Sequence, residues 1–93
     1  KVVNLKAKGD STTQITIDWK VPNNLNGATI TSYQIEKETS VDSGSWNIIG
    51  TNSISEFEYV DTGLTTDTEY SYRVSALSNN GQGAFAMVKG NTK

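Results

Sequence analysis

The stretch EYVDTGLTTDTEYSYRVSA, residues 58–76, joins a turn-forming half to a regularly alternating half. The first half is rich in Thr, Asp and Gly, residue types that favour turns. In the second half, apolar side chains alternate with polar ones, the period-2 pattern of a β-strand with one buried face. The alternating apolar residues are Tyr70, Tyr72, Val74 and Ala76. The stretch therefore predicts a turn that leads directly into a strand of the protein core.

Two residues flank this turn, Leu64 before it and Tyr70 after it. We expect Leu64 to fill the core where the chain passes from one sheet to another. A buried tyrosine needs a hydrogen-bond partner for its hydroxyl. At such a corner, Tyr70 is expected to hydrogen-bond the backbone a few residues upstream. Asp61 is expected to cap the same turn.

Period-2 alternation also marks the rest of the chain. The segment TQITIDW, residues 13–19, places Ile15, Ile17 and Trp19 on one face, so Trp19 is expected in the core. No segment has apolar residues at helical spacing over a helical length. Strands separated by turns every ~8–12 residues predict an all-β antiparallel sandwich. The seven predicted strands are residues 2–8, 13–19, 30–38, 46–50, 56–60, 69–77 and 84–90.

Taken together, these segments resemble the fibronectin type III domain over the whole chain. The resemblance implies a seven-stranded antiparallel Greek-key β-sandwich with an immunoglobulin-like fold, and one domain spanning residues 1–93. The DTGL form of the corner looks most like prokaryotic members of the family. The segments that carry the resemblance are ITIDW (15–19), ITSYQIEKE (30–38), SW (45–46), the corner stretch (59–76) and NNGQG (79–83).

The chain departs from the family pattern at the corner, where Pro and Gly are common and this chain has Thr66 and Asp67. Asp tolerates the left-handed backbone conformation better than most residues, so the turn remains feasible. No Arg-Gly-Asp sequence is present, so the integrin-binding site of some members is not implied. In the family that site lies in the loop before the last strand, here residues 78–83.

The composition limits the function classes. The 93 residues suffice for one domain, and the net charge of −2 without a basic stripe argues against nucleic-acid binding. Cys and His are both absent, which removes disulfides, thiolate metal sites and the usual catalytic constellations. The Asp residues lack the spacing of a calcium loop. We therefore predict no enzyme activity, no cofactor, no metal site and, since no apolar run is long enough, no membrane insertion.

Paired carboxylates at Glu36 and Glu38 could in principle serve acid–base chemistry. Because they alternate along a regular strand, we expect them instead on its solvent face. If this strand pairs with residues 69–77, as in the family, Arg73 is expected to lie beside Glu36. Trp46 opens a strand after a polar turn, where its ring is expected to be half exposed, either packed across the sheet edge or open to a sugar.

The loops at residues 21–29 and 78–83 are expected at one end of the sandwich, where partners commonly bind. They are polar and lack the Trp, Tyr and Arg anchors typical of interfaces, so intrinsic binding there is expected to be weak or absent. The candidate partner-contact residues are Asn24, Asn26, Trp46, Asn79, Asn80 and Gln82.

The sequence favours a non-catalytic structural or interaction module, a spacer or adhesion unit of a larger extracellular or cell-surface protein. The alternative is a carbohydrate-contacting accessory module of a secreted polysaccharide-degrading enzyme. The chain begins at Lys1 without a Met or a signal peptide, so we expect a piece of a longer protein. Expected partners are neighbouring domains and a protein or glycan ligand, and the isolated chain is expected to be monomeric.

Overall fold

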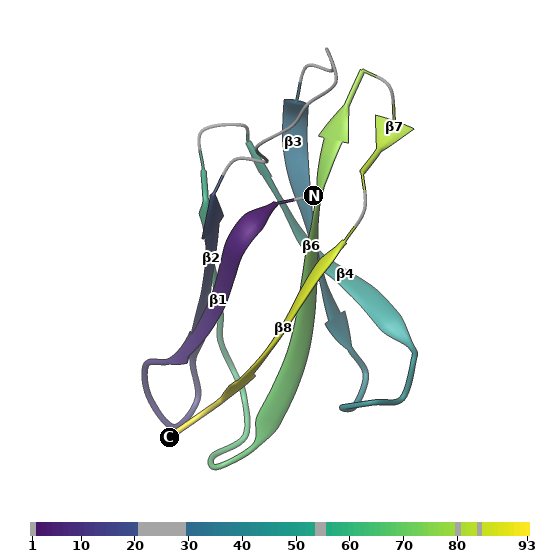
Figure 1. The fold of residues 1–93 in the computed structure, drawn as a ribbon. Coiled ribbons are helices and arrows are strands. Elements are labelled where there is room, and N and C mark those ends of the chain that lie inside the picture. Colours follow the sequence, from purple (N-terminus) through teal and green to yellow (C-terminus); the bar gives the residue numbers. More distant parts are fainter. Residues whose placement is uncertain (1, 21–29, 54–55, 80, 84) are drawn as a thin grey trace.

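The computed structural model describes residues 2–20, 30–53, 56–79, 81–83 and 85–93. These residues form two packed β-sheets and no helix, which confirms the predicted all-β sandwich (Figure 1). The strands are β1 Val3–Gly9, β2 Ile15–Lys20, β3 Ile30–Glu38, β4 Trp46–Ser53, β5 Glu58–Asp61, β6 Glu69–Ser78, β7 Gly81–Gln82 and β8 Ala86–Asn91.

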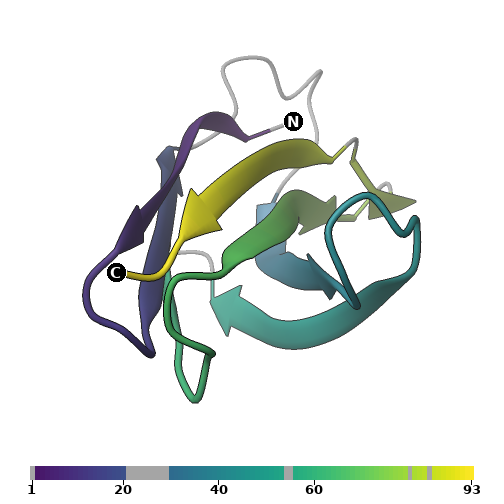
Figure 2. The ribbon, with the colours of Figure 1, turned by 90° about the horizontal axis from the view of Figure 1, so that it is seen from below.

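The small sheet has the order β1-β2-β5, and the large sheet has the order β4-β3-β6, with β7 and β8 both paired to β6. Every pairing is antiparallel. Seen along the strands, the two sheets form two separate layers (Figure 2). One prediction is corrected, because Gly81 and Gln82 pair with Ser78 and Leu77 where a loop was expected. The last long strand accordingly begins at Ala86.

The core lies between the sheets and is built from the inward positions of the alternating strands. Trp19 is buried, as predicted, and its ring meets Tyr33 edge to face at 5.5 Å between centroids. The ring of Phe57 contacts Tyr33 from another side at 5.8 Å. The buried apolar residues are Val2, Ile15, Ile17, Trp19, Ile30, Tyr33, Ile35, Leu64, Tyr72, Val74 and Ala76.

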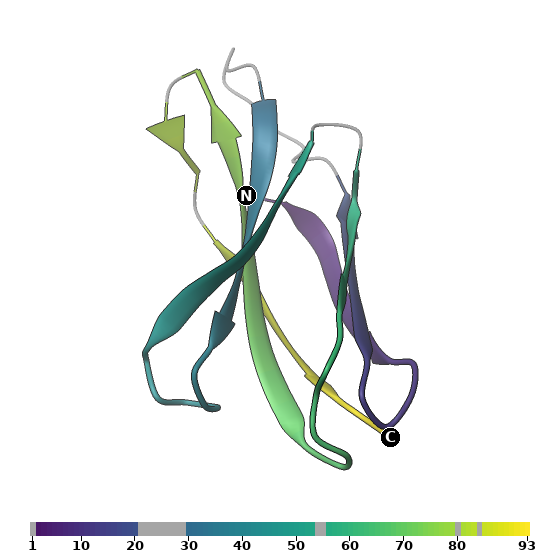
Figure 3. The same ribbon diagram turned by 180° about the vertical axis from the view of Figure 1, so that it is seen from behind.

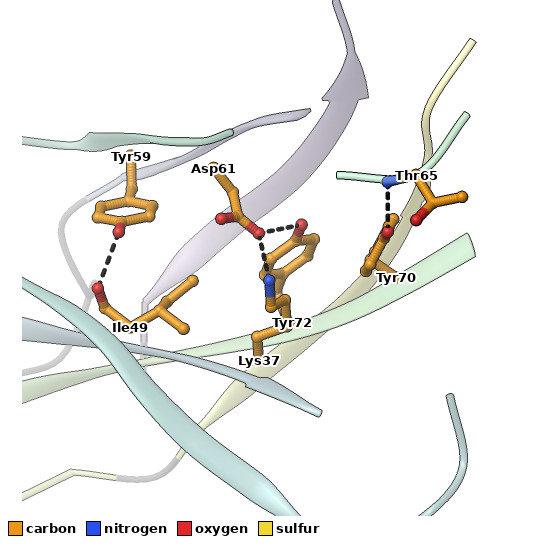
Figure 4. Close-up of polar contacts among 7 residues, drawn as sticks. All are labelled: Lys37, Ile49, Tyr59, Asp61, Thr65, Tyr70 and Tyr72. Atoms are coloured by element: carbon orange, nitrogen blue, oxygen red, sulfur yellow. Dashed lines mark hydrogen bonds and ion pairs between the residues drawn. The ribbon is translucent and has the colours of Figure 1, made fainter. Parts of the chain in front are cut away.

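The corner before β6 has the geometry that the sequence predicts. Leu64 is buried, and its backbone N–H donates to the carbonyl of Thr13 at 3.0 Å. The backbone N–H of Thr65 donates to the Tyr70 hydroxyl oxygen at 2.8 Å (Figure 4). Asp67 adopts the left-handed conformation with φ of 51°, as expected of an Asp in place of Gly. The corner thus ties the start of β6 to the turn that precedes it.

Strands β1 and β8 run side by side and close one side of the sandwich (Figures 1 and 2). They approach so closely that a Cβ atom added at the buried Gly90 would lie 2.8 Å from the Cβ of Ala7. A Cβ at Gly9 would overlap the backbone of Asn91. Glycine at these two positions lets a strand of each sheet pack backbone against backbone.

We predict that Gly90→Ala destabilises the fold by about 1–3 kcal/mol, because the new methyl group overpacks the contact with β1. Gly83→Ala is the matched control, since its Cβ would make an ordinary contact 3.4 Å from the Ala76 carbonyl oxygen. Urea unfolding followed by tryptophan emission measures both variants. Equal stability of the two variants would contradict the close-approach argument.

Candidate interaction surface

The outward face of the large sheet carries an arginine between two aromatic rings. The guanidinium carbon of Arg73 lies 4.5 Å from the ring centroid of Trp46 and 3.9 Å from that of Phe85. Its Nη2 donates to Glu36 Oε1 at 3.0 Å, so the predicted cross-strand ion pair is confirmed. A guanidinium stacked on aromatic faces gains cation–π attraction while its edge remains available for the carboxylate.

Glu36 and Glu38 were expected to be exposed, and the structure corrects this, because they are only 6% and 7% exposed. They do point away from the core, but other side chains and a turn cover them. Arg73 covers Glu36, whose second oxygen also accepts from Gln34 Nε2 at 2.9 Å. Both carboxylates are therefore structural anchors of the outward face.

The turn at residues 39–45 folds back onto Glu38. The backbone N–H groups of Gly44 and Asp42 donate to the two carboxylate oxygens at 2.8 and 3.2 Å. These bonds, that from Gly44 above all, lower the pKa of Glu38 below its ordinary value. Asp42 adopts a left-handed φ of 64° in this turn, so the carboxylate holds a bend that the backbone alone disfavours.

An open hollow of about 450 Å³ lies between this turn and the corner before β6. Apolar surface makes up most of its lining, and hydroxyl and carboxylate groups contribute the rest. Glu38 already has backbone donors on both oxygens, which accounts for its burial without any ligand. The lining residues are Glu38, Thr39, Ser40, Val41, Thr68, Glu69, Tyr70 and Ser71.

Two apolar side chains on the outward face of the large sheet are strongly exposed. Ile48 on β4 and Met87 on β8 are each 63% exposed. These two residues and Phe85 were not among the contact residues predicted from the sequence. The alternation of side chains along β8 could have predicted the outward position of Met87. Ala86 and Val88 pack against the core, so the residues next to them must face outward.

Inside the sandwich, a carboxylate links the two sheets. Asp61 on β5 accepts a hydrogen bond from the Tyr72 hydroxyl at 2.8 Å and one from Lys37 Nζ at 3.0 Å (Figure 4). Burial, and then the bond to Asp61, raises the pKa of Tyr72. The expected role of Asp61 as a turn cap is thus wrong, because its side chain points between the sheets.

The predicted contact residues do not form one cluster. Trp46 is half-buried, as expected, and pairs with Glu38 at the far end of β3. Asn79 and Gln82 are exposed at the opposite end of the large sheet, where Gln82 Nε2 donates to Ser75 Oγ at 2.8 Å. Asn24, Asn26 and Asn80 lie outside the described residues. Partner contact at these positions stays a prediction.

Within residues 2–20, 30–53, 56–79, 81–83 and 85–93, no three acidic groups come together as metal ligands. In the same part of the chain, no helix has the length and apolarity needed to cross a bilayer. The polar groups that do meet, at Glu36, Glu38 and Asp61, are held by neighbouring protein groups. The outward face of the large sheet remains as the candidate interaction surface.

Comparison with known proteins places the chain in a family. The profile described as fibronectin type III domain matches residues 1–87. The chain is 35% identical to titin of Drosophila melanogaster over 86 residues, 92% of its length, and 33% identical to a titin homolog of Caenorhabditis elegans over 84 residues, 90% of its length. Rounded to a whole percent, the chain covers 0% of the length of each of these two relatives. Both relatives are animal proteins. The sequence had been expected to be most similar to prokaryotic members of the family, and these two relatives do not support that expectation.

Among solved structures, the fourth FNIII domain of a human protein superposes with a TM-score of 0.85. It is 26% identical, and the match covers 98% of this chain and 76% of that one. The predicted fold family is therefore confirmed by sequence and by structure.

The Glu38 anchor predicts an acid-sensitive contribution to stability. Its lowered pKa in the folded state means that the contribution is present above its unfolded pKa of about 4.3 and is lost as the pH falls through the folded value. Glu38→Gln should therefore be less stable than the native chain at neutral pH, with the difference shrinking in acid. Urea midpoints between about pH 3 and pH 7 measure this.

Glu58→Gln, which removes an exposed carboxylate from β5, is the matched control. A stability difference for Glu38→Gln that stays constant across this range would contradict the proposed anchoring.

Proposed function

The chain belongs to the fibronectin type III family, and we propose that it is a non-catalytic spacer or adhesion unit of a large multidomain protein. The observation that carries this proposal is the match to two titins, of which a domain like this one forms only a minute fraction. A domain that is similar to part of such a long protein is expected to be linked to other domains in the same chain. These neighbouring domains are its expected partners.

The shape of the sandwich supports a spacer. Its long axis measures 42 Å, against 25 and 18 Å across. Strand β1 begins toward one end of this axis, and the chain finishes at the other end after β8 (Figure 1). A load applied through the two ends acts along the strands, so the hydrogen bonds between β1 and β2 share it in shear.

We also propose an extracellular or cell-surface location for the parent protein. This part rests on the spacer and adhesion roles that the family resemblance implies. Surface labelling of cells that express the full-length parent, compared with the labelling of a cytoplasmic marker, tests it. Protection of the parent from an impermeant reagent would count against the location and leave the spacer role intact.

The spacer role predicts a mechanical signature in a tandem of identical copies stretched by atomic force microscopy. Each unfolding event should lengthen the chain by roughly 280 Å, the extended length of 93 residues less a folded span of up to 42 Å. Ile17→Ala, which opens a cavity in the core, should lower the unfolding force and leave the increment unchanged. Extension without discrete events would refute a load-bearing role.

A second candidate, a carbohydrate-contacting module, is favoured by two half-buried aromatic residues on one face, Trp46 and Phe85. Aromatic faces are common platforms for apolar sugar surfaces. In this structure, however, each ring stacks on Arg73, so one face of each is already occupied. This observation makes the spacer the better-supported function.

Co-sedimentation with a panel of insoluble polysaccharides, with tryptophan emission for soluble ones, separates the two candidates. We expect no saturable binding. Binding that Trp46→Ala abolishes, and that Phe57→Ala on another part of the surface retains, would replace the spacer with the carbohydrate module.

A further inference from the structure

Thr92 fastens the end of β8 to the corner before β6. Its backbone N–H donates to the carbonyl of Thr68 at 3.1 Å, and the N–H of Thr68 donates to the Thr92 hydroxyl oxygen at 3.0 Å. The hydroxyl itself donates to the carbonyl of Thr65 at 2.6 Å. Thr92 is only 4% exposed, so water has little access to these bonds. They begin just beyond Glu69–Asn91, the end pair of the ladder between β6 and β8.

Lys93 extends this fastening to the small sheet. Its backbone N–H donates to the carbonyl of Ser11, in the turn between β1 and β2, at 2.9 Å. Its carbonyl accepts from the N–H of Asp67, in the corner, at 3.2 Å. The end of the chain therefore lies beside that turn and beside the corner (Figures 1 and 2). We call Thr92 and Lys93, with the hydrogen bonds that hold them, the β8 clip.

The β8 clip joins strands that are otherwise only packed together. Strand β8 pairs with β6 from Glu69–Asn91 to Val74–Ala86, but no ladder joins it to β1 in the part of the chain that the structure describes. The bond from Lys93 to Ser11 provides a direct backbone link between β8 and the small sheet. The clip thus connects the end of one strand to both sheets.

We propose that the β8 clip is a mechanical lock, which passes a load that arrives through Lys93 to both sheets at once. This inference rests on the proposed spacer function, in which the domain carries load between its neighbours. Without the clip, a pull at Lys93 acts on the ladder between β6 and β8 alone, and β8 can leave while the other strands stay paired. With the clip, the segments around Ser11 and Thr65 share the load, so the sheets yield together.

The lock acts on the rate of unfolding. Forced unfolding is governed by this rate and not by the equilibrium between folded and unfolded chains. Interactions that are already lost in the transition state slow unfolding and leave the folding rate nearly unchanged. The β8 clip lies where the load enters, so its bonds break before β8 separates from β6. Its loss should therefore speed unfolding most when the load enters at Lys93.

A single chain held at constant force in magnetic tweezers, with handles at residues 1 and 93, tests the lock. Thr92→Val removes the hydroxyl and keeps the shape of the side chain. It should unfold about fivefold faster than the native chain or more, the effect of losing one or more buried hydrogen bonds. Thr92→Ser keeps the hydroxyl and should unfold at close to the native rate. An unchanged rate in Thr92→Val would overturn the proposal.

A second pulling direction separates a lock from a general contribution to stability. Thr51 is exposed on β4, and the chain has no Cys, so Thr51→Cys gives a unique attachment point. With handles at residues 1 and 51, Lys93 carries no load, and Thr92→Val should lose most of its effect on the unfolding rate. Equal acceleration in both pulling directions would show that Thr92 stabilises the fold without acting as a lock.

Thr31→Val is the matched control. It removes a hydroxyl that donates to the Leu77 carbonyl at 3.2 Å, at the opposite end of the large sheet, and should unfold at the native rate. Equal acceleration by this variant would overturn the lock, and thermal unfolding checks that all variants are folded. Discrete native unfolding without any effect of Thr92→Val would refute the lock alone. A native chain that extends without discrete events would refute the spacer function and the lock together.

Discussion

The hydrogen bond from the Tyr72 hydroxyl to the Asp61 carboxylate joins the two sheets inside the protein, and their packing depends on it. Asp61 is 8% exposed, so its charge needs partners, and Lys37 of the large sheet provides the second. A buried charge without partners costs far more than a buried pair. The two sheets can therefore pack around Asp61 only in an arrangement that brings β3, β5 and β6 together.

A second tyrosine hydroxyl also joins the two sheets by a hydrogen bond, at another place in the sandwich. The Tyr59 hydroxyl on β5 donates to the carbonyl of Ile49 on β4 at 2.8 Å, which ties the sheets together at the side opposite β1 and β8 (Figures 3 and 4). Its ring packs against Gly50, where a Cβ would collide with it. With only 34% hydrophobic residues, the chain combines a small core with directional bonds at the edges of that core.

Directional polar contacts also organise the outward face of the large sheet. On the large sheet, the guanidinium of Arg73 and the turn at residues 39–45 cover two carboxylates that would otherwise be solvated. Ile48 on β4 and Met87 on β8 remain exposed on the same face. The face is therefore neither a plain charged surface nor a preformed ligand cleft.

The sequence by itself determined the long strands, the inward faces of Trp19 and Tyr72 and the corner around Tyr70, because these features depend on period-2 alternation and short-range turn chemistry, whereas the short β7 was not predicted. It also indicated the Glu36–Arg73 pair, through the strand pairing of the family. Only the tertiary structure decided the burial of Glu38, the role of Asp61 and the stacking of Arg73 on the rings of Trp46 and Phe85. Each of these depends on groups brought together across strands or by a returning turn. Alternation assigns a side chain to a face, but the residues that cover that face come from elsewhere in the chain.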